Sequence, residues 1–259
     1  AYGWWDGLDR SLTILKGRDR EGDIRFYRPF FEKAGTELRY IYPDTLQDEM
    51  GKLVDGPVLC AFSQMELEAL TLPQIDAILA SDCLNPLSTI FLLHDKRFLA
   101  VLWDDAFRTA ALGEEDAAFL KRFLVGTYTR AQDPDLWAHA YENKDAYILK
   151  PQLLGKSEGI VPGPLVETAA WQAIFDSPEI EEMVLQEWVD QKVFEGSIDG
   201  RRFADYGTGT LLCMEDELLG LGQFRMSSCE VINYIQDDRK MVPWVDTAGE
   251  PYDRSHFAL

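Results

Sequence analysis

The stretch YILKP at residues 147–151, together with GKSEGI at residues 155–160, decides how this sequence is interpreted. The apolar run at the start of the first segment predicts a buried strand, and Lys150 follows that run. A strand would hold the aliphatic stem of Lys150 in a sheet while its ammonium leaves the apolar layer. Such a lysine is a point charge suited to phosphate oxygens, so the segment predicts a triphosphate site and makes ATP the first candidate ligand.

Two glycines bracket the turn after this strand. Gly155 and Gly159 would let backbone N–H groups approach phosphate oxygens, with Lys156 and Ser157 between them. Their spacing matches neither the Walker loop nor the three-glycine dinucleotide fingerprint. Two interpretations therefore stay open: a turn that covers phosphates, or a β-turn that carries two solvated charges.

Two further apolar segments stand in an order that suits a nucleotide site. Residues 89–93 (TIFLL) read as a buried strand that leads to Asp95 and Lys96. Residues 183–189 (MVLQEWV) read as a strand whose apolar run is interrupted by two polar residues. A purine edge needs a backbone donor and a backbone acceptor between apolar faces, and a strand that leads into a hinge supplies them.

In this order the segments resemble the ATP-grasp superfamily, and within it the carboxylate–amine ligases related to glutathionylspermidine synthase. That family combines an Asp-Lys segment, a Lys-Pro-x-x-Gly-Arg-x-Gly segment and a hinge strand that contains glutamine. The matching residues here are Asp95-Lys96, Lys150-Pro151 with Gly155, Lys156 and Gly159, and Gln186-Glu187-Trp188. Residues 207–212, 219–225 and 231–233 resemble the closing strands of the family. The resemblance covers residues 89–245.

The resemblance implies a fold and a role for each matching residue. The fold is α/β (α+β): an ATP-grasp domain over residues 94–259, preceded by a pre-ATP-grasp lobe with a parallel sheet over residues 1–93. Lys96 and Lys150 would hold ATP phosphates. The residues expected to cover the phosphates are Gly155, Lys156, Ser157 and Gly159, and those expected to cradle adenine are Gln186, Glu187, Trp188 and Val189.

Magnesium is the second cofactor that the resemblance implies, because hard oxygen ligands suit this ion. In the glutathionylspermidine synthase arrangement the ligands precede the lysines, where this sequence holds only scattered acids. In ATP-grasp proteins whose segments are not permuted, the magnesium ligands come after the hinge strand in the chain. Asp205, Glu230 and Asn233 are the residues available there. Glu230 and Asn233 would face opposite ways on a plain strand, unless a β-bulge intervenes. Three explanations remain: the sequence is the C-terminal portion of a longer synthetase, the metal ligands are atypical, or the active site has decayed.

Arg225 is the second candidate catalytic residue beside Lys150. It lies on an expected central strand, where an arginine needs a carboxylate or phosphate partner. That partner is either the transferring phosphoryl group or, in an internal salt bridge, Asp205 or Glu230. His94 beside Asp95 is not interpreted as an acid–base pair, because neighbours on a strand point to opposite faces.

Composition limits the classes of function. The 259 residues are 46% hydrophobic, which is enough for a substantial core. The net charge of −20 argues against nonspecific binding to nucleic acid or to an anionic membrane.

The four cysteines lack zinc-site spacing, and Cys60 and Cys213 read as buried small hydrophobes. Neither a signal peptide nor a membrane-length apolar run is recognisable, so a cytoplasmic setting is expected.

Periodicity predicts the remaining elements. Strands are expected over 38–42 and 58–62, and alternation with helices indicates a parallel sheet. The expected helices are 25–34, 65–70, 72–79, 114–124 and 166–175, the last packing on the Lys150 strand. The aromatic residues Phe119 and Phe123 are expected in the core.

The sequence therefore favours an ATP-dependent ligase. By resemblance, ATP would phosphorylate a carboxylate of an amino acid or peptide, and an amine would attack the acyl phosphate to give an amide. Two alternatives remain open: an ATP-grasp kinase that acts on a hydroxyl, and a nucleotide-binding module without turnover.

Overall fold

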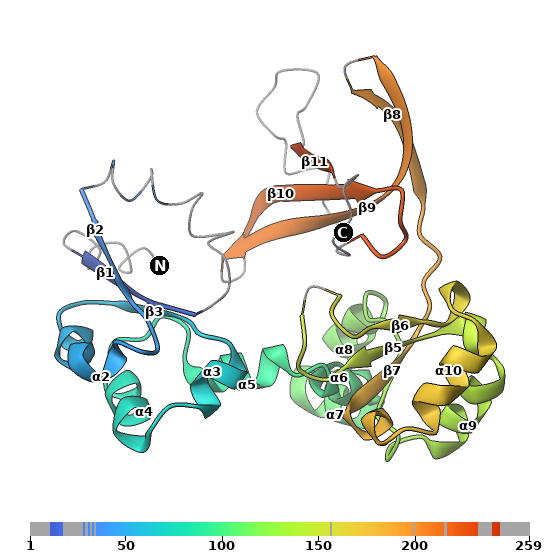
Figure 1. Ribbon diagram of the computed structural model, residues 1–259, viewed down its shortest axis with the longest axis horizontal. Helices are drawn as coiled ribbons and strands as arrows, with labels where there is room; N and C mark the ends of the chain where they lie inside the picture. Colours follow the sequence, from blue (N-terminus) through green and yellow to red (C-terminus); the bar gives the residue numbers. More distant parts are fainter. Residues whose placement is uncertain are drawn as a thin grey trace. The chain divides into compact units, whose positions relative to one another are not determined.

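The computed structural model describes residues 11–17, 28, 31, 33, 35–155, 157–198, 200–214, 217–232 and 240–243 (Figure 1). The chain divides into two compact units, Ala1–Phe98 and Leu99–Leu259. Both units combine helices with strands, so the predicted α/β class is confirmed. The helix expected over 25–34 lies mostly outside the described residues.

The N-terminal unit is built on a three-stranded parallel sheet with the order β2-β1-β3. Its strands are β1 (Ser11–Lys16), β2 (Glu37–Ile41) and β3 (Val58–Ala61). Five consecutive buried residues in β1 show that this central strand is covered on both faces, as parallel strands require. The predicted parallel sheet is therefore confirmed, and so are the strands expected over 38–42 and 58–62.

Short helices follow the second and third strands. Helix α2 (Leu46–Glu49) and the 3-10 helix η2 (Met50–Val54) lie between β2 and β3, and α3 (Gln64–Glu68) and α4 (Leu72–Leu79) follow β3. Ser63 and Glu66 form a capping box at the start of α3, which fixes where that helix begins after β3. The helices predicted over 65–70 and 72–79 are thus confirmed.

The strand predicted over 89–93 is wrong, because these residues belong to helix α5 (Leu87–His94). A short continuous apolar run fits a buried strand and a helix equally well. Pro86 stands at the N-cap of α5, and Leu87 and Ile90 form its buried side. Asp95 and Lys96 therefore lie between α5 and the next helix, α6 (Arg97–Trp103), and do not follow a strand.

Helices and 3-10 turns make up much of the C-terminal unit. They are α7 (Asp105–Leu112), α8 (Glu114–Lys121), α9 (Pro134–Glu142), α10 (Thr168–Phe175), η3 (Lys144–Ala146), η4 (Gly163–Leu165) and η5 (Pro178–Glu182). Helices α8 and α10 confirm two predictions. The predicted burial of Phe119 and Phe123 is wrong: they are 42% and 55% exposed, because α8 buries Ala117 and ends at Lys121.

An antiparallel sheet with the order β4-β7-β5-β6 carries the Lys150 strand. Its strands are β4 (Thr127–Tyr128), β5 (Tyr147–Pro151), β6 (Val161–Pro162) and β7 (Met183–Glu187). Trp171 of α10 is fully buried against Leu149 and Leu185, and its indole N–H donates to the carbonyl of Ala140. The strands β5 and β7 and the packing of α10 on β5 agree with the sequence predictions.

A second antiparallel sheet has the order β11-β10-β9-β8. Its strands are β8 (Val193–Ile198), β9 (Arg201–Met214), β10 (Glu217–Ser227) and β11 (Lys240–Pro243). The strands predicted over 207–212 and 219–225 are confirmed within β9 and β10. The strand predicted over 231–233 is not formed by residues 231 and 232, which lie in a bend and turn, while Asn233 lies outside the described residues.

Two further expectations concern cysteine and the membrane. Cys60 is buried as predicted, and burial raises the pKa of its thiol to about 11. The side chain of Cys213 lies outside the part of the chain that can be described. Within that part, every helix is too short or too polar to cross a membrane.

Candidate functional site

Lys150 lies on the core strand β5 with a half-buried side chain. In the register of β5 and β7, Ile148 is opposite Gln186 and Lys150 is opposite Val184. Lys150 and Gln186 are therefore diagonal neighbours on one face of the sheet. The Lys150 ammonium donates to Gln186 Oε1 over 2.5 Å.

A chain of hydrogen bonds continues from Gln186 into the sheet. Gln186 Nε2 donates to Thr127 Oγ1 over 2.8 Å, and the Thr127 hydroxyl donates to the carbonyl of Val125 over 2.9 Å. Gln186 is 7% exposed and Thr127 is 1% exposed. Gln186 was expected to contact adenine. In the structure, its side-chain amide contacts Lys150 and Thr127.

The turn after β5 folds back onto the end of the strand. The N–H of Glu158 donates to the carbonyl of Gly155 over 3.0 Å, and both Ser157 and Gly159 have positive φ angles, 65° and 67°. A positive φ is uncommon outside glycine. A Cβ atom on Gly159 would lie 2.8 Å from Pro151 Cγ, so this position needs glycine. Lys156 lies outside the described residues.

Residues 187–189 form the end of β7 and the expected hinge, and two of their backbone N–H groups already donate hydrogen bonds. The N–H of Glu187 donates to the carbonyl of Gly126, and the N–H of Trp188 donates to the carbonyl of Ala146. Among the residues that the structure describes, the N–H of Val189 makes no hydrogen bond, and Val189 is 53% exposed. Val189 is thus the first hinge position whose backbone donor could meet the edge of a purine.

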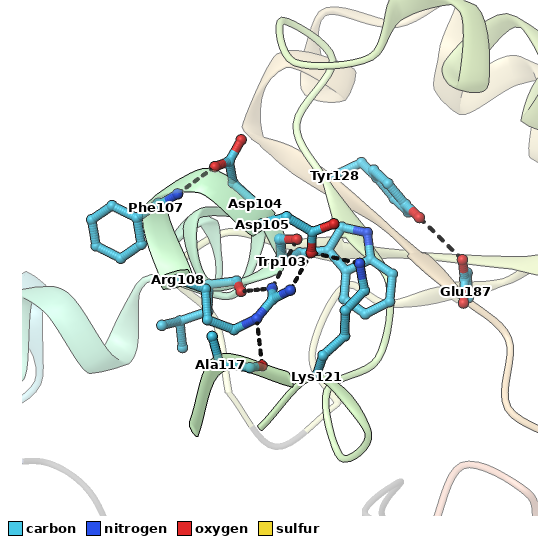
Figure 2. A network of polar contacts seen from close by, with 10 residues as sticks. Trp103, Asp104, Asp105, Phe107, Arg108, Ala117, Lys121, Tyr128 and Glu187 are labelled. Carbon is cyan, nitrogen blue, oxygen red and sulfur yellow. Dashed lines mark hydrogen bonds and ion pairs between the residues drawn. The ribbon is translucent and has the colours of Figure 1, made fainter. Parts of the chain in front are cut away.

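Glu187 takes part in a polar network beside the hinge, which Figure 2 shows. Glu187 Oε1 accepts from the hydroxyl of Tyr128 over 3.1 Å. The Tyr128 ring lies edge-on to Trp103, and the Glu187 carboxylate occupies the space of a side chain at Gly126, where a Cβ would lie 2.5 Å from Oε1. Burial and the nearby Glu187 carboxylate raise the pKa of Tyr128 to about 12.

Tyr128 is expected to ionise only near pH 12. A tyrosine in the unfolded chain has a pKa of about 10. The raised pKa therefore stabilises the folded state fully below pH 10, and this contribution is lost as the pH rises toward 12. The titration is followed by tyrosinate absorbance in the wild type and in Tyr128→Phe, and Glu187→Gln should lower the Tyr128 pKa. Ionisation of Tyr128 near pH 10 in the wild type would contradict this expectation.

Lys96 is half-buried in the N-terminal unit, whereas Lys150 belongs to the C-terminal unit. Burial lowers the pKa of the Lys96 ammonium, and the neighbouring Asp95 opposes this effect. Asp95 accepts from the backbone N–H and the guanidinium of Arg97. Asp95 thus stabilises the start of α6, a role that the sequence did not predict.

The register of β9 and β10 determines on which side of the sheet Arg225 lies. Arg225 is opposite Thr208, and strand alternation places Tyr206 on the same face and Asp205 on the other face. Glu230 Oε1 accepts from the Tyr206 hydroxyl over 3.1 Å, so Glu230 reaches the Arg225 face. Of the two salt-bridge partners that the sequence suggested for Arg225, Glu230 is bound by a residue on the Arg225 face, whereas Asp205 occupies a position on the other face.

Two of the three expected magnesium ligands lie among the described residues, Asp205 on β9 and Glu230 in the bends after β10. Asp205 is 2% exposed and points to the face of β9 opposite to Tyr206, whose hydroxyl donates to Glu230, and Asn233 lies outside the described residues. Among described side chains, no group of three His, Cys, Asp or Glu could hold a metal ion. Residues 228–232 form bends and a turn, so the strand spacing considered for Glu230 and Asn233 does not apply. The full set stays a prediction.

Comparisons with known proteins complete these observations. No family model matches the chain, and no curated protein matches it. Among solved structures, D-alanine–D-alanine ligase from Bacillus anthracis is similar to this chain with a TM-score of 0.38 and 15% sequence identity. The superposition covers 80% of this chain and 67% of that chain.

Proposed function

We propose that this chain binds ATP along β5 and β7 and uses it to join a carboxylate to an amine. The observation that carries the proposal is Lys150: its stem is fixed on a core strand, and its ammonium lies beside the hinge strand. The turn over residues 155–159 follows at once and contains two positive φ angles. A fixed cation next to an irregular turn suits a polyphosphate.

Adenine would lie at the end of β7. The Val189 N–H offers a donor there, and the exposed Val189 side chain offers an apolar contact. Lys150 would contact the phosphates, and the turn would cover them. The proposed cradle therefore uses the backbone of residues 187–189 for the base and side-chain charge for the phosphates.

The proposed reaction has two steps. A carboxylate oxygen of an amino acid or peptide attacks the γ-phosphorus of ATP, and the bond to the bridging oxygen breaks to give an acyl phosphate and ADP. An amine then attacks the acyl carbon, phosphate leaves, and the amine loses a proton to give an amide. Lys150 would neutralise charge on the phosphates, and Arg225 would stabilise the oxygens of the acyl phosphate.

A nucleotide-binding module without turnover is the second candidate. Asp205 and Tyr206, which binds Glu230, point to opposite faces of β9, and this favours the second candidate, because phosphoryl transfer needs charge neutralisation at one ion. ADP formation that requires both a carboxylate and an amine would support the ligase. ADP formation with a polyol alone would support a kinase.

Removal of the Lys150 ammonium is expected to weaken ATP binding about 10- to 100-fold, because it deletes charge-assisted contacts to phosphate. Calorimetric titration of ATP into the wild type and Lys150→Ala measures this, with and without magnesium. Lys52→Ala removes the same charge at an exposed ion pair with Glu49 and should bind ATP like the wild type.

Each outcome of this titration separates the candidates. Binding that needs magnesium and is lost in Lys150→Ala supports the ligase site. Binding without any magnesium dependence supports the module. A wild-type protein that does not bind ATP at all would sink the proposed function.

A further inference from the structure

Three neighbouring strands each contribute one polar side chain to the same face of the β4-β7-β5 sheet. Thr127 of β4 is opposite Gln186 of β7, and Gln186 is opposite Ile148 of β5, two residues before Lys150. The other face carries Leu149 and Leu185, which pack on Trp171. The polar residues thus form a row across the face that points away from α10.

The direction of every hydrogen bond in this row is determined. An ammonium can only donate, so Gln186 must present its Oε1 to Lys150 and its Nε2 to Thr127. Thr127 Oγ1 accepts from that amide, and its hydroxyl proton is donated to the Val125 carbonyl. A flipped Gln186 amide would place N–H groups against the ammonium, so only one orientation satisfies the row.

Burial and hydrogen bonds restrict the side chains of Gln186 and Thr127. Gln186 and Thr127 are both almost fully buried, and both ends of the Gln186 amide are engaged. A lysine side chain is otherwise flexible and loses rotamer freedom when it binds a ligand. Contacts made before the ligand arrives reduce that loss.

We propose that Gln186 and Thr127 are positioning residues, which hold the Lys150 ammonium in place for a nucleotide's phosphates, and that Gln186 does not read adenine. This inference rests on the proposed ATP site. It predicts that changes at Gln186 and Thr127 act on phosphate binding and leave the nucleoside part unaffected.

The test compares ATP with adenosine by calorimetric titration. Gln186→Glu keeps the shape of the side chain but pairs the Lys150 ammonium with a carboxylate, which competes with phosphate. ATP should bind about tenfold more weakly, while adenosine should bind as it does to the wild type. Gln172→Glu introduces the same charge on α10, at the opposite face of the sheet, and should leave both affinities unchanged.

Thr127 provides an independent arm of the test. Thr127→Val removes the hydroxyl that orients Gln186 and should weaken ATP binding about threefold to tenfold, again without an effect on adenosine. Thr127→Ser keeps the hydroxyl and should restore the ATP affinity. Thermal unfolding shows whether each variant is folded. If Thr127→Val is not folded, the test is the comparison of Gln186→Glu with the wild type.

The outcomes separate this inference from the function on which it rests. ATP binding by the wild type, with unchanged affinity in Gln186→Glu and Thr127→Val, would overturn the inference alone. Loss of adenosine binding in Gln186→Glu would assign Gln186 to adenine and would also overturn it. A wild type that binds neither ATP nor adenosine would remove the proposed function itself.

Discussion

Replacing Arg108 with leucine is expected to lower the free energy of unfolding of the C-terminal unit by about 3–5 kcal/mol. The Arg108 side chain is 2% exposed, and its guanidinium donates to the carbonyls of Leu102, Trp103 and Ala117. It also pairs with the Asp105 carboxylate (Figure 2). Leucine would leave three backbone carbonyls without this donor, and two of them lie at the C-terminal end of α6, where no further helical turn satisfies them.

Arg130→Leu is the matched control for this variant. Arg130 is 50% exposed and forms one ion pair with Glu181 over 2.7 Å. Exposed pairs of this kind contribute below about 1 kcal/mol. Urea denaturation of the two variants measures the difference, and equal losses of stability would show that the Arg108 contacts do not hold α6, α7 and α8 together.

The Arg108 network also reaches toward the hinge. Asp105 accepts from the Lys121 ammonium over 2.6 Å, and that ammonium lies 4.8 Å from the centre of the Trp103 ring. Trp103 in turn packs edge-on against Tyr128, which binds Glu187 at the end of β7. The helices α6 to α8 are therefore connected, contact by contact, with the strand end where adenine is proposed to bind.

The strands around Lys150 could be predicted because they carry a strong local signal. Apolar runs at residues 147–149 and 183–185 begin two segments, and both segments form strands. The run at residues 89–93 carries a signal of the same kind and forms a helix. The apolar run itself does not separate the two cases; the proline at position 86, which stands at the N-cap of α5, and the packing of Leu87 and Ile90 decide the outcome.

The partners of Lys150 could be predicted only in part. Gln186 stood out as a polar residue in an apolar run, yet the direction of its amide depends on Thr127, some sixty positions earlier in the chain. Thr127 lies in the two-residue strand β4, which is too short to show any periodicity. Arg108 was missed for a related reason, since an arginine in a short helix reads as exposed until the helices pack around it.

The face of the sheet on which Asp205 lies could likewise be assigned only from the register of β9 and β10. Asp205 and Glu230 are the acidic residues after the hinge that were expected as metal ligands, and strand alternation alone could not relate them, because the chain turns between them. Only the pairing of Ser227 with Tyr206, and the bond from Tyr206 to Glu230, shows which face each carboxylate occupies. Metal sites assembled from different strands are therefore poorly determined by residue spacing.

Gly163→Ala is expected to be the most damaging small substitution near the proposed site. A Cβ atom at Gly163 would lie 1.8 Å from the carbonyl oxygen of Lys144 and 2.7 Å from that of Tyr147. Both contacts are with backbone, so no side-chain rotation relieves them, and the backbone of η4 must move relative to η3 and the start of β5. We expect a loss of about 3 kcal/mol of stability and weaker ATP binding, because β5 carries Lys150.

Gly155→Ala supplies the control for Gly163→Ala. Among the residues that the structure describes, no atom lies within 4 Å of a Cβ built at Gly155, and its φ is not in the left-handed region. Its stability should therefore stay within about 0.5 kcal/mol of the wild type. Thermal unfolding of the two variants tests the comparison. If Gly163→Ala and Gly155→Ala unfold at the same temperature, then η4 does not fix the start of β5.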